Sequence, residues 1–265
     1  MDWKTLRALG SLKATALSLS MLGAQVLHAQ EITLDKKASL AQVYLPAVES
    51  ERLLSMNDLN VEFGYILYQA EITTQSDSEE LELENVRDYA AVYVNGKLQG
   101  TLTDNRKKMA IKTEPGKYLL QIYVENIGRI TYGPEITDNS KGLFGGITLD
   151  GNEIENWKIL PLNIRKFPTK NLHFDSNVND AGPGFYKGTF SPKDVKNTYL
   201  DISGWGMGEV WINSKYLGSY WEEEKQRSIL IPTENLVQGE NEIVVFELKN
   251  NQQKTMKLSQ TPVFK

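Results

Sequence analysis

The sequence lacks cysteine altogether, has only two histidines, and contains no apolar run of the roughly 20 residues that a membrane-spanning helix needs. The absence of cysteine excludes disulfides, thiolate zinc sites and cysteine nucleophiles. With only His28 and His173, neither a His-rich metal site nor a Ser-His-Asp triad is expected, and His173 is interpreted as a surface histidine. We therefore predict no metal, no cofactor and no membrane span.

Positive charge is also scarce in any one place. The 265 residues carry 29 Lys and Arg against 34 Asp and Glu, a net charge of −5, without a basic cluster. Phosphate contacts need concentrated positive charge, so no nucleic-acid partner is expected. A hydrophobic content of 40% is sufficient for a buried core. At about 150 residues per domain, the length allows one large domain or two small ones.

The first 30 residues differ from the rest. A basic start is followed by an uncharged stretch over residues 14–27, and Ala29 provides a small residue near its end. This pattern is typical of a secretory signal peptide, which would make the protein secreted or periplasmic. Apolar residues at helical spacing within residues 3–12 equally suit a helical remnant of a preceding domain. Residues 31–59 show no clear periodicity and are predicted to be a linker.

From residue 60 onward the pattern predicts strands throughout. Asn95-Gly96, after an alternating run, is a strong signal for a type I′ hairpin turn, which needs positive φ at both positions. Many short strands at regular spacing favour a sandwich or jelly roll. The alternating segments are residues 65–68, 91–94, 119–124, 210–212 and 242–246.

An internal repeat divides this β region into two units. Residues 92–100 (VYVNGKLQG) match residues 210–218 (VWINSKYLG) at an offset of 118 residues. Strand-like segments upstream and downstream repeat in the same order. The sequence therefore predicts an all-β chain of two tandem jelly-roll, galactose-binding-like sandwiches, at residues 60–162 and 183–265, with an inter-domain linker at residues 163–182.

Carboxylates are numerous, so a glycosidase pair has to be considered; such a pair needs two carboxyls about 5–10 Å apart across a cleft. Glu222–Glu224 lie beside Lys225 and Arg227, which indicates a solvated hairpin tip. Glu125 and Arg129 are expected to form a structural ion pair. The other candidates are Glu135, Asp138 and Glu209, and nothing singles out a proton donor, so no catalytic residue is assigned.

Aromatic side chains offer a second type of site. Trp205, Tyr220 and Trp221 could form a surface on which a sugar stacks, and core or inter-domain packing is the alternative. Trp211 alternates with apolar neighbours on a strand, so at least one aromatic of this group is expected in a core.

Several motifs resemble a known family. The matching segments include FGYILYQAEI (63–72), RDYAAVYVNGKLQGTL (87–102), VENIGRITYGPEITDNSKGLFGGITLDG (124–151), PGFYKGTF (183–190) and LDISGWGMGEVWINSKYLGSYW (200–221). In order and spacing, residues 60–265 resemble the C-terminal, non-catalytic region of glycoside hydrolase family 35 β-galactosidases. The resemblance implies jelly rolls that brace a catalytic TIM barrel carrying two glutamates. The region before residue 60 is too short for a barrel of about 250 residues, so hydrolysis by this chain alone is not expected.

The resemblance also implies roles for two residues. Tyr132, in the Gly-Arg…Tyr-Gly motif, would lie close to the sugar pocket of the barrel, with Arg129 holding the loop. Three positions depart from the family pattern: Ser214 replaces a usual glycine, and Ser219 and Gln69 replace usual arginines. The loss of two arginines weakens the expectation that the chain docks on a barrel in the usual way.

Three hypotheses follow. The first is an accessory β-sandwich region of a β-galactosidase-like enzyme, truncated or split, that supports or docks to a catalytic barrel. The second is a stand-alone secreted protein that binds a galactoside or plant-type glycan. The third is a subunit of an active β-galactosidase whose barrel is on another chain.

Overall fold

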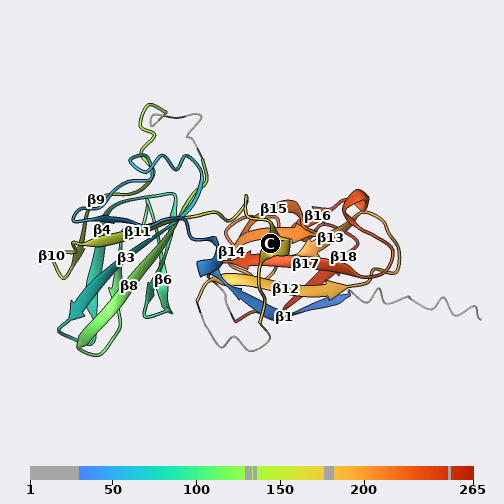
Figure 1. Cartoon of the computed structure of the whole chain (residues 1–265), viewed down its shortest axis with the longest axis horizontal. Coiled ribbons are helices and arrows are strands. Elements are labelled where there is room, and N and C mark those ends of the chain that lie inside the picture. The colour runs from blue at the N-terminus through green and yellow to red at the C-terminus, as the bar shows by residue number, and fades with distance from the viewer. Residues whose placement is uncertain (1–29, 129–132, 134–135, 176–181, 250–251) are drawn as a thin grey trace, which may run out of the picture.

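The computed structural model describes residues 30–128, 133, 136–175, 182–249 and 252–265, which form two β-sandwiches side by side (Figure 1). The described regular structure is strands and three short 3-10 helices, η1 (Leu40–Val43), η2 (Thr169–Asn171) and η3 (Thr233–Asn235). The prediction of an all-β chain is confirmed. Arg129 and Tyr132 lie outside the described residues.

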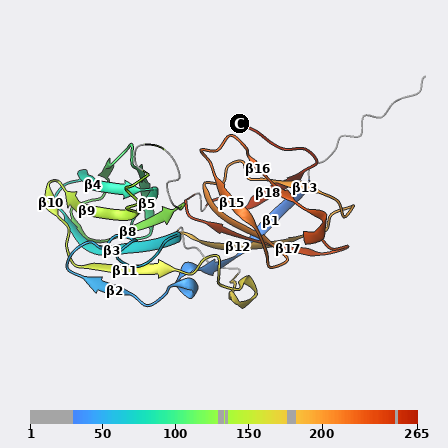
Figure 2. The ribbon, with the colours of Figure 1, turned by 90° about the horizontal axis from the view of Figure 1, so that it is seen from above.

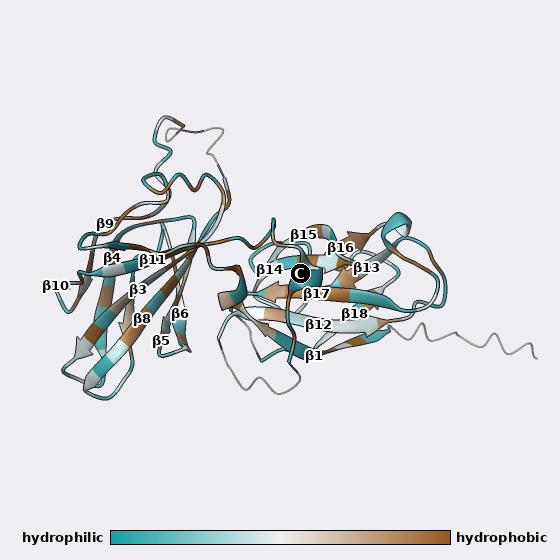
Figure 3. Ribbon diagram, in the orientation of Figure 1, coloured by the Kyte–Doolittle hydropathy of each residue, from teal (hydrophilic) through white to brown (hydrophobic). Residues whose placement is uncertain are grey.

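The first sandwich is built from ten strands: β2 (Val48–Ser50), β3 (Gly64–Thr74), β4 (Glu79–Arg87), β5 (Tyr89–Val94), β6 (Lys97–Thr103), β7 (Lys108–Ile111), β8 (Gly116–Asn126), β9 (Gly142–Leu149), β10 (Asn152–Glu153) and β11 (Trp157–Leu162). They form a six-stranded sheet in the order β2-β11-β3-β8-β5-β6 and a four-stranded sheet in the order β10-β9-β4-β7. Side chains from both sheets, such as Ile66, Leu83 and Ile122, fill the core between them, and hydrophobic residues occur between hydrophilic ones along the strands (Figure 3).

The second sandwich is built from β1 (Glu31–Ser39), β12 (Gly184–Phe190), β13 (Thr198–Asp201), β14 (Met207–Ile212), β15 (Lys215–Trp221), β16 (Ser228–Ile231), β17 (Asn241–Glu247) and β18 (Thr255–Ser259). These pair in the order β15-β14-β17-β12-β1-β18-β13-β16. The first residues of β1 pair with β18 and its last residues pair with β12, so this strand joins the two layers.

The linker prediction for residues 31–59 is wrong. Residues 31–39 form β1 in the middle of the second sandwich, and residues 48–50 form β2 at the edge of the first (Figure 2). Ile32 and Leu34 alternate with exposed residues as a strand requires, but a bulge after Leu34 then shifts the alternation and places Lys37 among the buried residues. Because the bulge interrupts the alternation of apolar and polar residues, the sequence pattern did not indicate this strand.

The internal repeat is a structural repeat. The sheet order β11-β3-β8-β5-β6 corresponds to β1-β12-β17-β14-β15, with the repeated hairpins β5–β6 and β14–β15 at equivalent places. Both hairpins turn through two residues of positive φ, Asn95-Gly96 (46° and 76°) and Asn213-Ser214 (50° and 62°), as type I′ turns require. In each turn the asparagine Oδ1 accepts a backbone N–H of the neighbouring strand, from Leu119 or Glu242.

The two equivalent sheets pack against each other, and this contact organises the candidate site. Every residue of β5 and of β14 is buried, because one face of each strand lines its own sandwich core and the other face contacts the opposite sandwich. The chain also crosses between the sandwiches after β1 and again after β11 (Figure 1). Two crossings and a shared apolar layer hold the two sandwiches together.

Candidate functional site between the two sandwiches

Aromatic rings from both sandwiches form the contact layer. Tyr65 of β3 meets Phe246 of β17 edge to face, with ring centroids 5.2 Å apart. Tyr89 of β5 meets Trp221 of β15 at 5.8 Å in the same manner. The Tyr93 hydroxyl donates a 2.6 Å hydrogen bond to the backbone oxygen of Leu248. Edge-to-face pairs and buried hydroxyl bonds of this kind impose one relative orientation on the sheets.

Two buried glutamates lie within this layer, one from each sandwich. Tyr65 Oη is 2.9 Å from Glu125 Oε1 of β8 and 3.1 Å from Glu209 Oε1 of β14. A phenol has one proton to donate, so the Tyr65 hydroxyl can bond both carboxylates only if they share that proton. Tyr65 therefore connects the sandwiches through a polar contact surrounded by apolar side chains.

Glu209 is compensated by a cation. Arg165, in the segment after β11, places both Nε and Nη2 2.7 Å from Glu209 Oε1. Its guanidinium also stacks over Phe63, 4.0 Å from the ring centroid, and Tyr216 donates a hydrogen bond to Glu209 Oε2. Each Glu209 oxygen thus has a donor, which a fully buried carboxylate requires.

Glu125 has fewer compensating contacts. It is 5% exposed, and Oε2 has no hydrogen-bond partner in the part of the chain that the structure describes. Burial raises the pKa of this carboxyl from 4.5 to about 7, opposed by the Tyr65 hydrogen bond and reinforced by the charge of Glu209. Burial likewise raises the pKa of the Tyr65 hydroxyl well above its ordinary value. Glu125 therefore changes its protonation near neutral pH, whereas Tyr65 keeps its proton.

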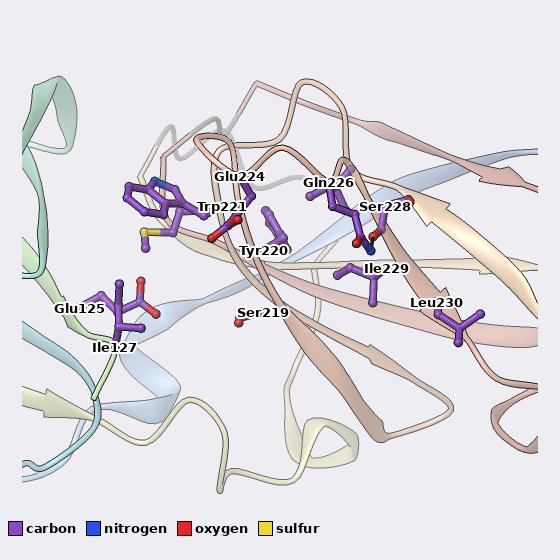
Figure 4. A pocket seen from close by; sticks show the side chains of 12 residues that line it. Glu125, Ile127, Ser219, Tyr220, Trp221, Glu224, Gln226, Ser228, Ile229 and Leu230 are labelled. Atoms are coloured by element: carbon purple, nitrogen blue, oxygen red, sulfur yellow. Dashed lines mark hydrogen bonds between the residues drawn. The ribbon is translucent and has the colours of Figure 1, made fainter. Parts of the chain in front are cut away.

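A cavity of about 380 Å³ opens beside Glu125, between the two sandwiches (Figure 4). The first sandwich contributes Glu125 and Ile127, and the remaining lining comes from the second sandwich. That lining consists of the apolar side chains Ile202, Met207, Ile229 and Leu230, the aromatic Tyr220 and Trp221, and the polar Ser219, Glu224, Gln226 and Ser228. A second cavity of about 400 Å³ lies on the Phe63 and Arg165 side of Tyr65.

The predicted aromatic site residues fall at different depths. Trp205 is 1% exposed in the core of the second sandwich, where Nε1 donates to Thr255 O and the ring packs against Tyr186. Tyr220 is 5% exposed and donates to Glu247 Oε2. The sugar-stacking interpretation does not fit these two buried rings, and the core alternative does. Trp221 is half-buried at the sandwich contact, and its indole nitrogen has no hydrogen-bond partner among the described residues.

Glu125 and Glu209 do not form a glycosidase pair. They lie close together but accept from the same hydroxyl, which leaves no room between those oxygens for a glycosidic bond. Asp138 pairs with Arg87 at the surface, and Glu222 pairs with Lys249. His173 is exposed in the segment after η2, where its backbone N–H donates to Gln42 Oε1 and its backbone oxygen accepts from Gln42 Nε2. Glu135 lies outside the described residues.

Within the described ranges, no group of three or more His, Asp or Glu side chains could hold a metal ion. Across the same ranges, no helix is long and apolar enough to cross a membrane.

Sequence reasoning missed the site around Tyr65. It placed Glu125 beside Arg129 and considered Glu209 only as one of several acidic residues. The available signal was positional: Glu125 directly follows an apolar strand segment in YVEN, and Glu209 lies within one in GEVWI. A charge in such a run points to a buried, compensated group or to an interface.

Comparison with known proteins places the fold in a family. The family described as "Beta-galactosidase, first all-beta domain" matches residues 54–163, and "Beta-galactosidase, galactose-binding domain" matches residues 183–241. A lectin from Pleurotus ostreatus, solved in complex with GalNAc, covers 87% of this chain and 78% of its own at 16% identity, but its TM-score of 0.26 is too low to carry an argument.

The similar curated proteins are β-galactosidases or β-galactosidase-like. Human β-galactosidase-1-like protein 2 is 33% identical over 211 residues, covering 76% of this chain and 32% of the relative. β-Galactosidase 17 of Arabidopsis thaliana is 31% identical over 237 residues, covering 77% and 34%. The β-galactosidase of Xanthomonas manihotis is 31% identical over 178 residues, covering 66% and 29%. The chain thus spans about a third of the length of these relatives. It belongs to the β-galactosidase family and carries two of its accessory all-β domains, the first all-β domain and the galactose-binding domain.

Proposed function

We propose that these two sandwiches act as one rigid accessory body that supports or docks to the catalytic barrel of a β-galactosidase. The observation that carries this proposal is the buried contact between the sandwiches. Its apolar layer, the Tyr65 contact to both glutamates and the two chain crossings hold the pair as one unit. A region that supports a catalytic barrel has to be rigid, and it needs no catalytic group of its own.

The family resemblance supplies the barrel and two contact residues for this proposal. Tyr132 would complete the rim of the sugar pocket in the barrel, and Arg129 would hold the loop that carries it. The barrel would lie on the same protein or on another chain. Secretion, suggested by residues 1–29, is part of the same proposal, and N-terminal sequencing of the protein from its native source tests it.

A stand-alone carbohydrate-binding role has weaker support. Two of the three aromatic residues suggested for sugar stacking, Trp205 and Tyr220, are in the core. Calorimetric titration with galactosides and plant-type glycans tests this role separately. A saturable signal that Trp221→Ala removes without unfolding would favour it.

The main test is enzymatic. The purified chain alone is expected not to hydrolyse a chromogenic β-galactoside. Added to the separately produced catalytic portion of a β-galactosidase from the same source, it is expected to raise that portion's activity or thermal stability. Hydrolysis by the chain alone that persists through repurification would contradict the proposal, as would a catalytic portion indifferent to the added chain.

A further inference from the structure

The cavity beside Glu125 contains a carboxylate that, among the described residues, feels the charge of Arg165 but has no cation in direct contact with it. Glu125 Oε1 is bonded by Tyr65, whereas Oε2 is buried and has no hydrogen-bond partner among the described residues. Arg165, which is part of the same cluster, directs its guanidinium to Glu209 instead. A buried carboxylate that lacks a donor is costly, and a cation that reaches it recovers that cost.

The remaining lining suits the same ligand. Among the described lining residues there is no Lys or Arg, whereas a second carboxylate, Glu224, is present. Ile229 and Met207 offer apolar surface for an aliphatic stem, and Trp221 offers a ring over which a guanidinium can stack. Figure 4 shows Glu125 and Ile127 on the side of the first sandwich, opposite Ser219 and Tyr220 of the second.

The cavity is open to the outside, and Glu125 Oε2 lies just behind its wall, so pairing with a ligand requires the carboxylate to turn toward the cavity. Ile127, on the rim, is 53% exposed, and Ser219 presents only a short side chain to the cavity. A cavity of about 380 Å³ has room for a long side chain.

We propose that this cavity is a socket for a guanidinium group, filled by an arginine side chain of the catalytic domain when the two parts dock. The planar fork of a guanidinium matches a carboxylate through two parallel hydrogen bonds, which an ammonium group cannot reproduce. This inference rests on the proposed docking function for its source of arginine, but the socket itself is a property of the isolated chain.

The first experiment therefore uses the isolated chain with arginine amide and methylguanidinium as probes, titrated by calorimetry or NMR. Both probes are expected to bind saturably, and Glu125→Gln is expected to lower the affinity about tenfold or more, because a charge-assisted pair is lost. Ser219→Arg is expected to abolish probe binding by filling the socket from within, whereas the matched control Ser219→Ala retains it.

Binding is also expected to depend on pH. The groups facing Glu125 are Tyr65, Glu209, Arg165 and Asp88, with Glu224 across the cavity. Since the Glu125 pKa is about 7, its ionised fraction rises roughly tenfold between pH 6 and pH 8, and the probe affinity is expected to follow it. A probe affinity that is the same at both pH values would overturn the assignment.

Four outcomes test the socket and the source of the arginine separately. Tighter probe binding in Arg129→Ala would mean that the chain's own arginine occupies the socket, and would overturn a partner source. Binding of galactose without binding of arginine amide would make the cavity a hydroxyl site, which also overturns the proposal. If the chain docks to the catalytic portion and Glu125→Gln docks equally well, the socket fails while the docking function stands. If the probes bind but the chain does not dock to the catalytic portion, the socket stands and the docking function fails.

Discussion

Replacing Glu125 by glutamine should remove a pH dependence of stability that is built into the contact between the sandwiches. The Glu125 pKa is about 7 in the folded chain, against an ordinary value of 4.5. The folded state therefore holds this proton more tightly than the unfolded state does. The contribution of Glu125 to the free energy of unfolding is greatest below pH 4.5, falls as pH rises, and is lost above about pH 7. At 1.36 kcal/mol per pH unit, the full change is about 3 kcal/mol.

Between pH 5 and pH 8 the free energy of unfolding of the wild type should fall, relative to that of Glu125→Gln, by about 2–3 kcal/mol. Urea unfolding followed by tryptophan fluorescence at several pH values measures this difference, and any constant effect of the amide cancels in the comparison. Glu71→Gln, which removes an exposed carboxylate from the neighbouring strand β3, is the matched control and should run parallel to the wild type. Parallel curves for the wild type and Glu125→Gln would refute the account of Glu125 as a buried carboxyl short of compensation.

Five further substitutions, one of them a control, test other parts of the fold. Ser214→Gly should raise the free energy of unfolding by about 0.5–1 kcal/mol, because Ser214 has φ 62° in its turn, and Gly96→Ser in the equivalent turn should lower it by a similar amount; both are measurable by urea denaturation. Gly208→Ala should destabilise by about 3 kcal/mol or more in scanning calorimetry, since a Cβ there would lie 1.7 Å from the Phe246 backbone oxygen, while Gly218→Ala, whose nearest neighbour would be 3.8 Å away, should be nearly neutral. Tyr93→Phe should cost about 1–2 kcal/mol by removing the buried hydrogen bond to Leu248, and an unchanged urea midpoint would show that this bond does not join the sandwiches.

Local rules gave the repeated part of the fold. The hairpins β5–β6 and β14–β15 were predictable because their alternation and turn residues lie within about ten residues of sequence. The same rules failed for β1, since only Ile32 and Leu34 precede its bulge, and since its partners β12 and β18 are more than 140 residues away. Pairing over such a distance leaves no local signal.

The candidate site was less predictable than the fold. Tyr65, Glu125, Glu209 and Arg165 come from four separate segments, and only the packing of one sandwich on the other brings them together. Trp205 was proposed as a site residue but lies in the core. It is buried because the Tyr186 ring and the Thr255 backbone oxygen lie next to it, and composition does not reveal these neighbours.

The central claim is that this chain is an accessory body that docks to a catalytic domain. The most direct measurement is a calorimetric or sedimentation titration of the chain against the catalytic portion of a β-galactosidase from the same source. A saturable one-to-one complex is expected. A catalytic portion that stays unbound at concentrations well above the micromolar range, with both proteins folded, would contradict it.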